Sequence, residues 1–118
     1  MQHIDDKILK RLAEQEKRGG IQIGMLQPGT RIEAKTKNTL YEIEILDPVN
    51  RPLIIKIHGG SYFKEPASVQ LNGSTWGGAM LKLGWLGIGM CMEFAECTTT
   101  PVQSLKVIAP DKSWEYEI

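Results

Sequence analysis

Four side chains in the sequence have the chemistry to bind a metal ion: His3, His58, Cys91 and Cys97. Zinc sites in small domains use closely spaced ligand pairs such as Cys-x2-Cys, and these four residues show no such spacing. Cys91 and Cys97 lie six positions apart on an expected strand and its exit, which puts their Cα atoms far beyond disulfide distance. We therefore predict two free thiols, no metal site and no cofactor.

The same residues make poor catalysts in their sequence context. Cys91 lies between two methionines in the least polar part of the chain, which favours the thiol over the reactive thiolate. His58 is expected to point outward on a strand beside Lys56, as solvated histidines do. Because no nucleophile, base and orienting group occur together, we predict that the protein is not an enzyme and has no catalytic residue.

Glycine is concentrated in one apolar segment. Six of the twelve glycines lie between Gly73 and Gly89, and the stretch from Pro66 to Met92 contains one charged residue, Lys82. A phosphate-binding loop needs a strand before it and a helix after it, and this segment has the pattern of a strand. Glycines among Trp, Leu and Met instead predict a backbone packed closely against the chain itself, another subunit or a ligand.

A loop of the sequence Gly-Gly-Ser-Tyr-Phe-Lys, residues 59–64, has the elements of a base-stacking platform, namely two aromatic rings and a lysine. Basic residues upstream are nearly balanced by acidic ones, and Tyr62 and Phe63 serve equally well as a cap on a barrel. Single-stranded nucleic-acid binding is therefore an alternative hypothesis. Its residues are Arg31, Lys35, Lys37, Tyr62, Phe63 and Lys64.

Composition describes an ordinary globular chain. Its 118 residues, 42% hydrophobic and 24% charged, are enough for one domain with its own core. Fourteen basic and fourteen acidic residues cancel, so no overall field favours nucleic acid or an anionic membrane. The sequence shows neither a signal-peptide core nor an apolar run of membrane-span length, so we predict a cytoplasmic protein with no membrane partner.

Hydrophobic periodicity predicts one amphipathic helix followed by strands. Apolar residues recur at helical spacing over residues 4–18, and Gly19-Gly20 end the pattern. From Ile21 the period changes to two, with turns every 8–12 residues. Asn72-Gly73 predicts a hairpin turn, and residues 85–94 predict one strand.

We therefore predict a mainly β fold: a small bent β-barrel, or a sandwich, of about seven short strands with an N-terminal α-helix. The expected parts are the helix (residues 1–20), the barrel (21–109) and a C-terminal tail or edge strand (110–118).

A series of short motifs resembles a set of small, uncharacterised bacterial β-rich proteins. The motifs are Pro-Gly-Thr-Arg-Ile-Glu (28–33), Thr-Lys-Asn (36–38), Gly-Ser-Thr-Trp-Gly-Gly (73–78) and Leu-Lys-x-Gly-Trp-x-Gly-x-Gly-Met (81–90). The resemblance spans roughly residues 23–108. It implies no activity, ligand or catalytic residue.

These observations favour a non-enzymatic assembly or adaptor module that acts through protein–protein association, with a partner or with itself. The helix and the tail are the expected docking elements. Interface or core anchors are expected at Trp76, Trp85, Met90 and Trp114, because tryptophan and methionine are common at the centres of interfaces. A third hypothesis is a small-ligand pocket lined by Trp76, Trp85 and the glycine-rich strand.

Overall fold

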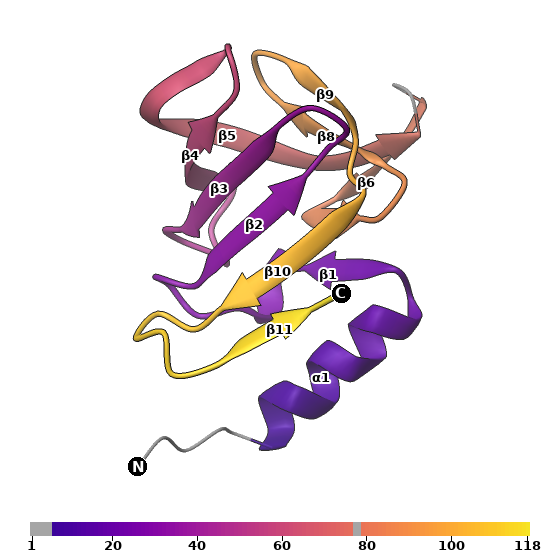
Figure 1. Ribbon diagram of the computed structural model, residues 1–118, viewed down its shortest axis with the longest axis vertical. Coiled ribbons are helices and arrows are strands. Elements are labelled where there is room, and N and C mark those ends of the chain that lie inside the picture. Colours follow the sequence, from indigo (N-terminus) through magenta and orange to yellow (C-terminus); the bar gives the residue numbers. More distant parts are fainter. Residues whose placement is uncertain (1–5, 77–78) are drawn as a thin grey trace.

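The computed structural model describes residues 6–76 and 79–118. The predicted metal candidate His3 and the predicted helix start at Ile4 lie outside these residues. The described residues form one α-helix, one short 3-10 helix and eleven strands (Figure 1). Strands hold 52% of the residues and helix 13%, which confirms a mainly β protein with an N-terminal helix.

The N-terminal helix, α1 (Asp6–Lys17), lies along one side of the molecule (Figure 1). Its Leu12 is fully buried, and Ile8 packs against the core, as the helical spacing predicts. The helix ends at Gly19, whose φ of 76° is the left-handed conformation typical of a helix C-terminus. The chain then enters β1 (Gly20–Gln22), which pairs antiparallel with β7 (Trp85–Gly87), and a 3-10 turn, η1 (Ile23–Met25).

The remaining strands form a larger antiparallel sheet in the order β11-β10-β2-β3-β4-β5-β8-β9, with β6 also paired to β5. Their bounds are β2 (Arg31–Lys35), β3 (Leu40–Ile45), β4 (Ile54–Gly59), β5 (Phe63–Trp76), β6 (Ala79–Leu83), β8 (Cys91–Phe94), β9 (Thr98–Pro101), β10 (Ser104–Ile108) and β11 (Glu115–Glu117). The period-two pattern places Ile32, Ile43, Ile55 and Ile57 in the core, and charged residues alternate with them on the outer face.

The expected hairpin turn at Asn72-Gly73 is wrong, because β5 continues through it, with an irregularity in its pairing to β8 between Leu71 and Gly73. The two-residue turn that this dipeptide favours needs positive φ at both residues, and here Gly73 alone has it, at 148°. Gly73 has a different role: a Cβ atom on it would collide with the carbonyl oxygen of Lys82 on β6. Glycine therefore lets β6 approach β5 closely, and the two strands pair antiparallel with Trp76 opposite Ala79.

The strand expected over residues 85–94 is two strands, β7 and β8, separated by a turn. The two pair with different partners, β7 with β1 and β8 with β5, so the chain must change direction between them. Gly89 makes this possible with a φ of 81°. Both faces of the segment are covered, since Trp85 and Cys91 are buried as well as Leu86 and Met92.

The sheets are not closed into a barrel. The larger sheet begins at β11 and ends at β9, and β1 and β7 form a separate pair. The count of about seven strands is also too low, because turns and a change of partner divide the predicted segments into eleven. Within the expected tail, β11 lies at the edge of the sheet beside β10 (Figure 1).

Candidate functional site

The four predicted anchor residues lie in different environments. Trp85 and Met90 are buried, and Trp114 packs partly buried against the core. The Trp85 ring occupies a slot beside Gly20, where a Cβ atom would lie 2.6 Å from it, so this tryptophan belongs to the core of the chain. Trp76, at the end of β5, is 58% exposed and is the most exposed of the four anchors.

Trp76 is part of an exposed apolar cluster on the β5–β6 hairpin. The hairpin patch, as we call it, consists of Trp76, Met80, Leu81 and Leu83, with exposed fractions of 58, 84, 43 and 66%. The remaining large exposed hydrophobic residues of the described chain are separated in sequence, on β3, after it and in loops: Leu40, Leu46, Val49 and Tyr62. The hairpin lies at the upper right of the molecule, away from the β3–β4 side (Figure 1).

The one charge on β6 belongs to Lys82, whose side chain is exposed. The ammonium group of Lys82 lies 3.9 Å from the centroid of the Trp85 ring, in a cation–π contact. On the neighbouring strand, the hydroxyl of Ser74 donates to the Trp85 carbonyl at 2.5 Å and accepts from the Gly87 amide at 3.2 Å. These contacts fix the base of the hairpin against β7, and Lys82 is the one charged side chain among the exposed residues of β6.

Strand β6 is an open edge. It pairs with β5 on one side, and no strand of the described chain pairs with its other side. Its register against β5 shifts between Ser74 and Trp76, and at this irregularity Met80 has a φ of 59°. The left-handed conformation costs a residue with a side chain about 1–2 kcal/mol. Met80 is 84% exposed, so its side chain gains little packing within the described chain to offset this cost.

Sequence reasoning did not single out the exposure of Met80, Leu81 and Leu83. The available signal is the run Met-Leu-Lys-Leu after Gly77-Gly78, which lacks the alternation of a strand with one buried face.

The residues of the nucleic-acid hypothesis are partly brought together. The β2–β3 turn contains Lys37, and the β4–β5 turn contains Tyr62. The two turns lie close together, as shown by Gly60, where a Cβ atom would lie 3.0 Å from the Thr39 side chain. Arg31, Lys35, Lys37, Tyr62 and Lys64 are exposed, although Arg31 lies at the far end of β2.

Phe63 does not belong to an exposed platform. It is buried, with its ring edge-on to Phe94 at 5.6 Å, because β5 begins here and its first side chain turns inward. Tyr62 donates a hydrogen bond to Glu96 at 3.3 Å, so a carboxylate lies where a phosphate would have to approach. The prediction that both aromatic rings stack on bases is therefore wrong for Phe63.

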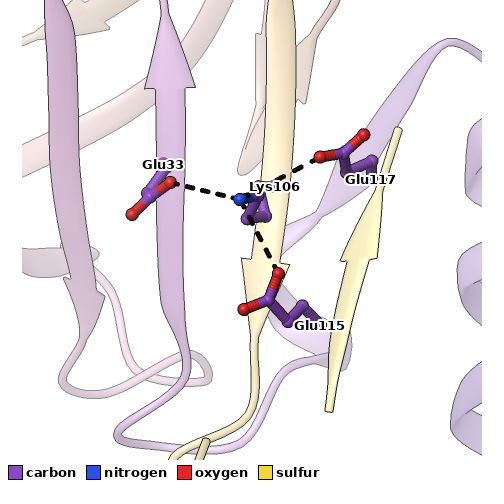
Figure 2. A network of polar contacts seen from close by, with 4 residues as sticks. All are labelled: Glu33, Lys106, Glu115 and Glu117. Carbon is purple, nitrogen blue, oxygen red and sulfur yellow. Dashed lines mark ion pairs between the residues drawn. The ribbon is translucent and has the colours of Figure 1, made fainter.

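The outer face of the large sheet carries both signs of charge. Lys106 on β10 is surrounded by three carboxylates, at 3.6 Å from Glu115, 3.9 Å from Glu33 and 4.0 Å from Glu117 (Figure 2). A shallow hollow of about 410 Å³ beside this cluster is lined by further residues of both signs: Arg31, Glu42, Glu44, Lys56, His58 and Lys112. The ligand pocket expected around Trp76 and Trp85 does not coincide with this hollow, which contains neither residue.

Cys91 is buried and Cys97 is partly buried, and both are free thiols. Burial, and after it the charge of Glu96, raises the pKa of Cys97, so this residue stays protonated at neutral pH. Over residues 6–76 and 79–118, no three His, Cys, Asp or Glu side chains lie close enough to hold a metal ion. His58 is exposed, and its Nε2 lies 3.1 Å from the carbonyl oxygen of Lys64.

Comparison of the chain with protein-family models, curated proteins and solved structures finds no match. Among the described residues, no helix has the length and apolar character needed to cross a membrane.

Proposed function

We propose that the protein is a non-enzymatic assembly or adaptor module that binds another protein chain through the hairpin patch. The observation that carries this proposal is the coincidence of exposed apolar side chains and an unpaired strand edge on β6. An open edge offers backbone donors and acceptors to an added strand, and apolar side chains beside it supply the energy of burial.

The size of the patch supports the same conclusion. Summed over the four side chains, the exposed apolar surface is on the order of 500 Å², and successive residues of β6 direct it to both faces of the strand. Trp76 is suited to the centre of such an interface, because tryptophan combines a large rigid surface with few torsions to immobilise. We place this activity in the cytoplasm, since a reducing compartment suits two unpaired thiols.

A second candidate function, binding of single-stranded nucleic acid, is supported by the exposure of Lys37 and Tyr62 on two turns that lie close together at Thr39 and Gly60. It is weakened by the burial of Phe63 and by the carboxylate of Glu96. Binding of this kind would fall steeply with added salt.

The proposal is tested by capture of cellular proteins on the immobilised full chain, followed by titration of each purified candidate. The disrupted variant carries Leu81→Glu and Leu83→Glu. Its matched control carries Leu40→Glu and Leu46→Glu, which are also exposed leucines, at 47 and 38%. We expect the disrupted variant to lose at least about tenfold in affinity, because charges are excluded from interface cores, and the control to bind as the wild type does. Equal binding by both variants would contradict the proposal.

A further inference from the structure

We propose that the occupant of the β6 edge is a second copy of this chain, with the two β6 strands pairing antiparallel about a twofold axis. This inference rests on the proposed function and names its partner. The resulting dimer would join two sheets into one and bury both hairpin patches.

The edges at β11 and β9 are protected, whereas β6 carries one exposed lysine and one side-chain hydrogen bond, from Gln22 Nε2 to the Leu83 carbonyl oxygen at 3.3 Å. On β11, Glu115 and Glu117 make the edge acidic, and the Tyr116 hydroxyl donates to Glu16 of α1 at 2.8 Å. On β9, Pro101 has no amide hydrogen to offer. Charges, proline and covering elements are the usual means by which proteins prevent edge pairing. On β6, the exposed residues that flank the single lysine are Met80, Leu81 and Leu83, which favour edge pairing.

Charge favours a copy of the chain over a charged partner. The four residues of the hairpin patch carry no ionised group, and the exposed Lys82 between Leu81 and Leu83 contacts the Trp85 ring with its ammonium. A strongly basic partner would find no carboxylate on β6, and a strongly acidic one would find a single ammonium that already contacts an aromatic ring. A copy of the chain presents the same apolar surface, and its net charge of zero adds no long-range repulsion between the two molecules.

Charge also selects the register. A twofold axis at Lys82 would place two lysines directly opposite each other, which is unfavourable for a cross-strand pair. A twofold axis at Leu81 instead pairs Leu81 with its own copy and sets Met80 opposite Lys82. This register makes the interface isologous, with the same residues contributed by both chains.

The area of the patch sets the strength of the dimer. Stable interfaces bury about 800 Å² on each partner, and the patch offers on the order of 500 Å², so we expect a weak dimer with a dissociation constant in the micromolar range. The dimer would form and separate with concentration and would not be permanent.

The first test is light scattering behind size exclusion on the purified chain, from about 1 µM to several hundred µM, which spans a micromolar dissociation constant. The wild type should pass from 13.2 kDa to twice that mass as concentration rises. The Leu81→Glu, Leu83→Glu variant should remain a monomer throughout, and the Leu40→Glu, Leu46→Glu control should dimerise like the wild type.

The second test reports the register and does not depend on charge. Opposed residues of antiparallel strands have Cα atoms about 4.5–5.5 Å apart, which is within disulfide range. Mild oxidation of Leu81→Cys should therefore give a disulfide-linked dimer, whereas Leu40→Cys, with a similarly exposed side chain, should not. The native thiols interfere little, since Cys91 is buried and burial raises the pKa of Cys97.

The outcomes separate this inference from the proposed function. A wild type that stays monomeric at the highest concentration, yet binds a different protein through the hairpin, contradicts the proposed dimer and leaves the proposed function standing. A dimer that persists in the Leu81→Glu, Leu83→Glu variant also overturns it. Absence of any binding that depends on the hairpin overturns both proposals.

Discussion

The edges of the larger sheet at β11 and at β6 are built from opposite kinds of residues. At β11, two glutamates share the ammonium of Lys106 (Figure 2), and the Tyr116 hydroxyl donates a hydrogen bond to Glu16 of α1. At β6, the exposed side chains are a methionine, two leucines and one lysine, whose ammonium contacts the Trp85 ring. Both strands are short, so length does not explain the difference. The β11 edge is covered by contacts within the chain, whereas the β6 edge is suited to pair with a strand of another chain.

The largest expected effect comes from adding a side chain at Gly73, where β6 approaches β5 closely. In Gly73→Ala, the new Cβ atom would collide with the carbonyl oxygen of Lys82, a backbone atom that cannot rotate away. We expect the free energy of unfolding to fall by about 3 kcal/mol, measured by urea denaturation, as the hairpin is forced away from the sheet.

Gly24→Ala is the control for this substitution. The nearest atom to its Cβ, the carbonyl oxygen of Pro48, lies 3.8 Å away, so the change in unfolding free energy should stay within about 0.5 kcal/mol. Equal losses at Gly73 and Gly24 would show that the close approach of β6 is not needed.

Met80→Gly should separate stability from association at the open edge. Glycine accepts the φ of 59° without strain, so the free energy of unfolding of the monomer, measured by thermal denaturation, should rise by up to about 1 kcal/mol. The dimer should weaken at the same time, because an 84% exposed side chain is lost from the hairpin patch.

Lys112→Gly is the matched case in a turn, with a φ of 62°. It should gain similar stability and leave the dimerisation constant unchanged. A Met80→Gly protein that dimerises as well as the wild type would show that Met80 lies outside the interface.

At the protected edge, Lys106→Met should have a smaller effect. It removes three ion pairs of 3.6–4.0 Å and leaves three carboxylates close together, but all four groups are in contact with solvent. We expect a loss of about 1 kcal/mol in unfolding free energy at low salt, shrinking as salt is added.

Lys56→Met on β4 is the comparison, because Lys56 has no ion pair within 4.0 Å in the part of the chain that the structure describes. It should change stability little at either salt concentration. A loss in Lys106→Met that does not depend on salt would mean that packing, and not charge, holds β11.

The smallest effect is expected from Tyr116→Phe, which removes the hydrogen bond between β11 and α1. The hydrogen bond to Glu16, with burial contributing less, raises the pKa of Tyr116 above the ordinary tyrosine value. A raised tyrosine pKa stabilises the fold below the unfolded value and ceases to do so as pH rises through the folded value. The wild type should therefore melt slightly above Tyr116→Phe at neutral pH. The difference should vanish in alkaline solution beyond pH 10, and a constant difference across this range would contradict the assignment.

Periodicity alone predicted much of the fold. The helix stripe through Leu12 and the alternation that buries Ile32 and Ile43 follow from spacing, because one side of each element must face the core. Spacing did not reveal which strands pair. The β7–β8 segment looked continuous because both of its parts are apolar, and its division depends on partners more than ten residues away in the sequence.

The candidate site was predicted less well, for a related reason. Trp76 and Trp85 are the same residue type in the same glycine-rich segment, and sequence alone gave them equal weight. Their difference arises from what lies across from them: Trp85 fills a slot beside Gly20, and Trp76 ends a strand. Asn72-Gly73 misled for a similar reason, because its glycine serves a close approach between strands and not a turn.

The position of β10 beside β2 has a consequence for synthesis. Strand β2 (residues 31–35) has β3 as one neighbour soon after it is made, but its other neighbour, β10, comes at residues 104–108. While the intervening chain is being synthesised, the β2 edge remains without its native partner on the ribosome. At about 5–20 residues per second, this interval lasts several seconds. The alternating charges Arg31, Glu33 and Lys35 along that strand would keep the waiting edge hydrated until β10 arrives.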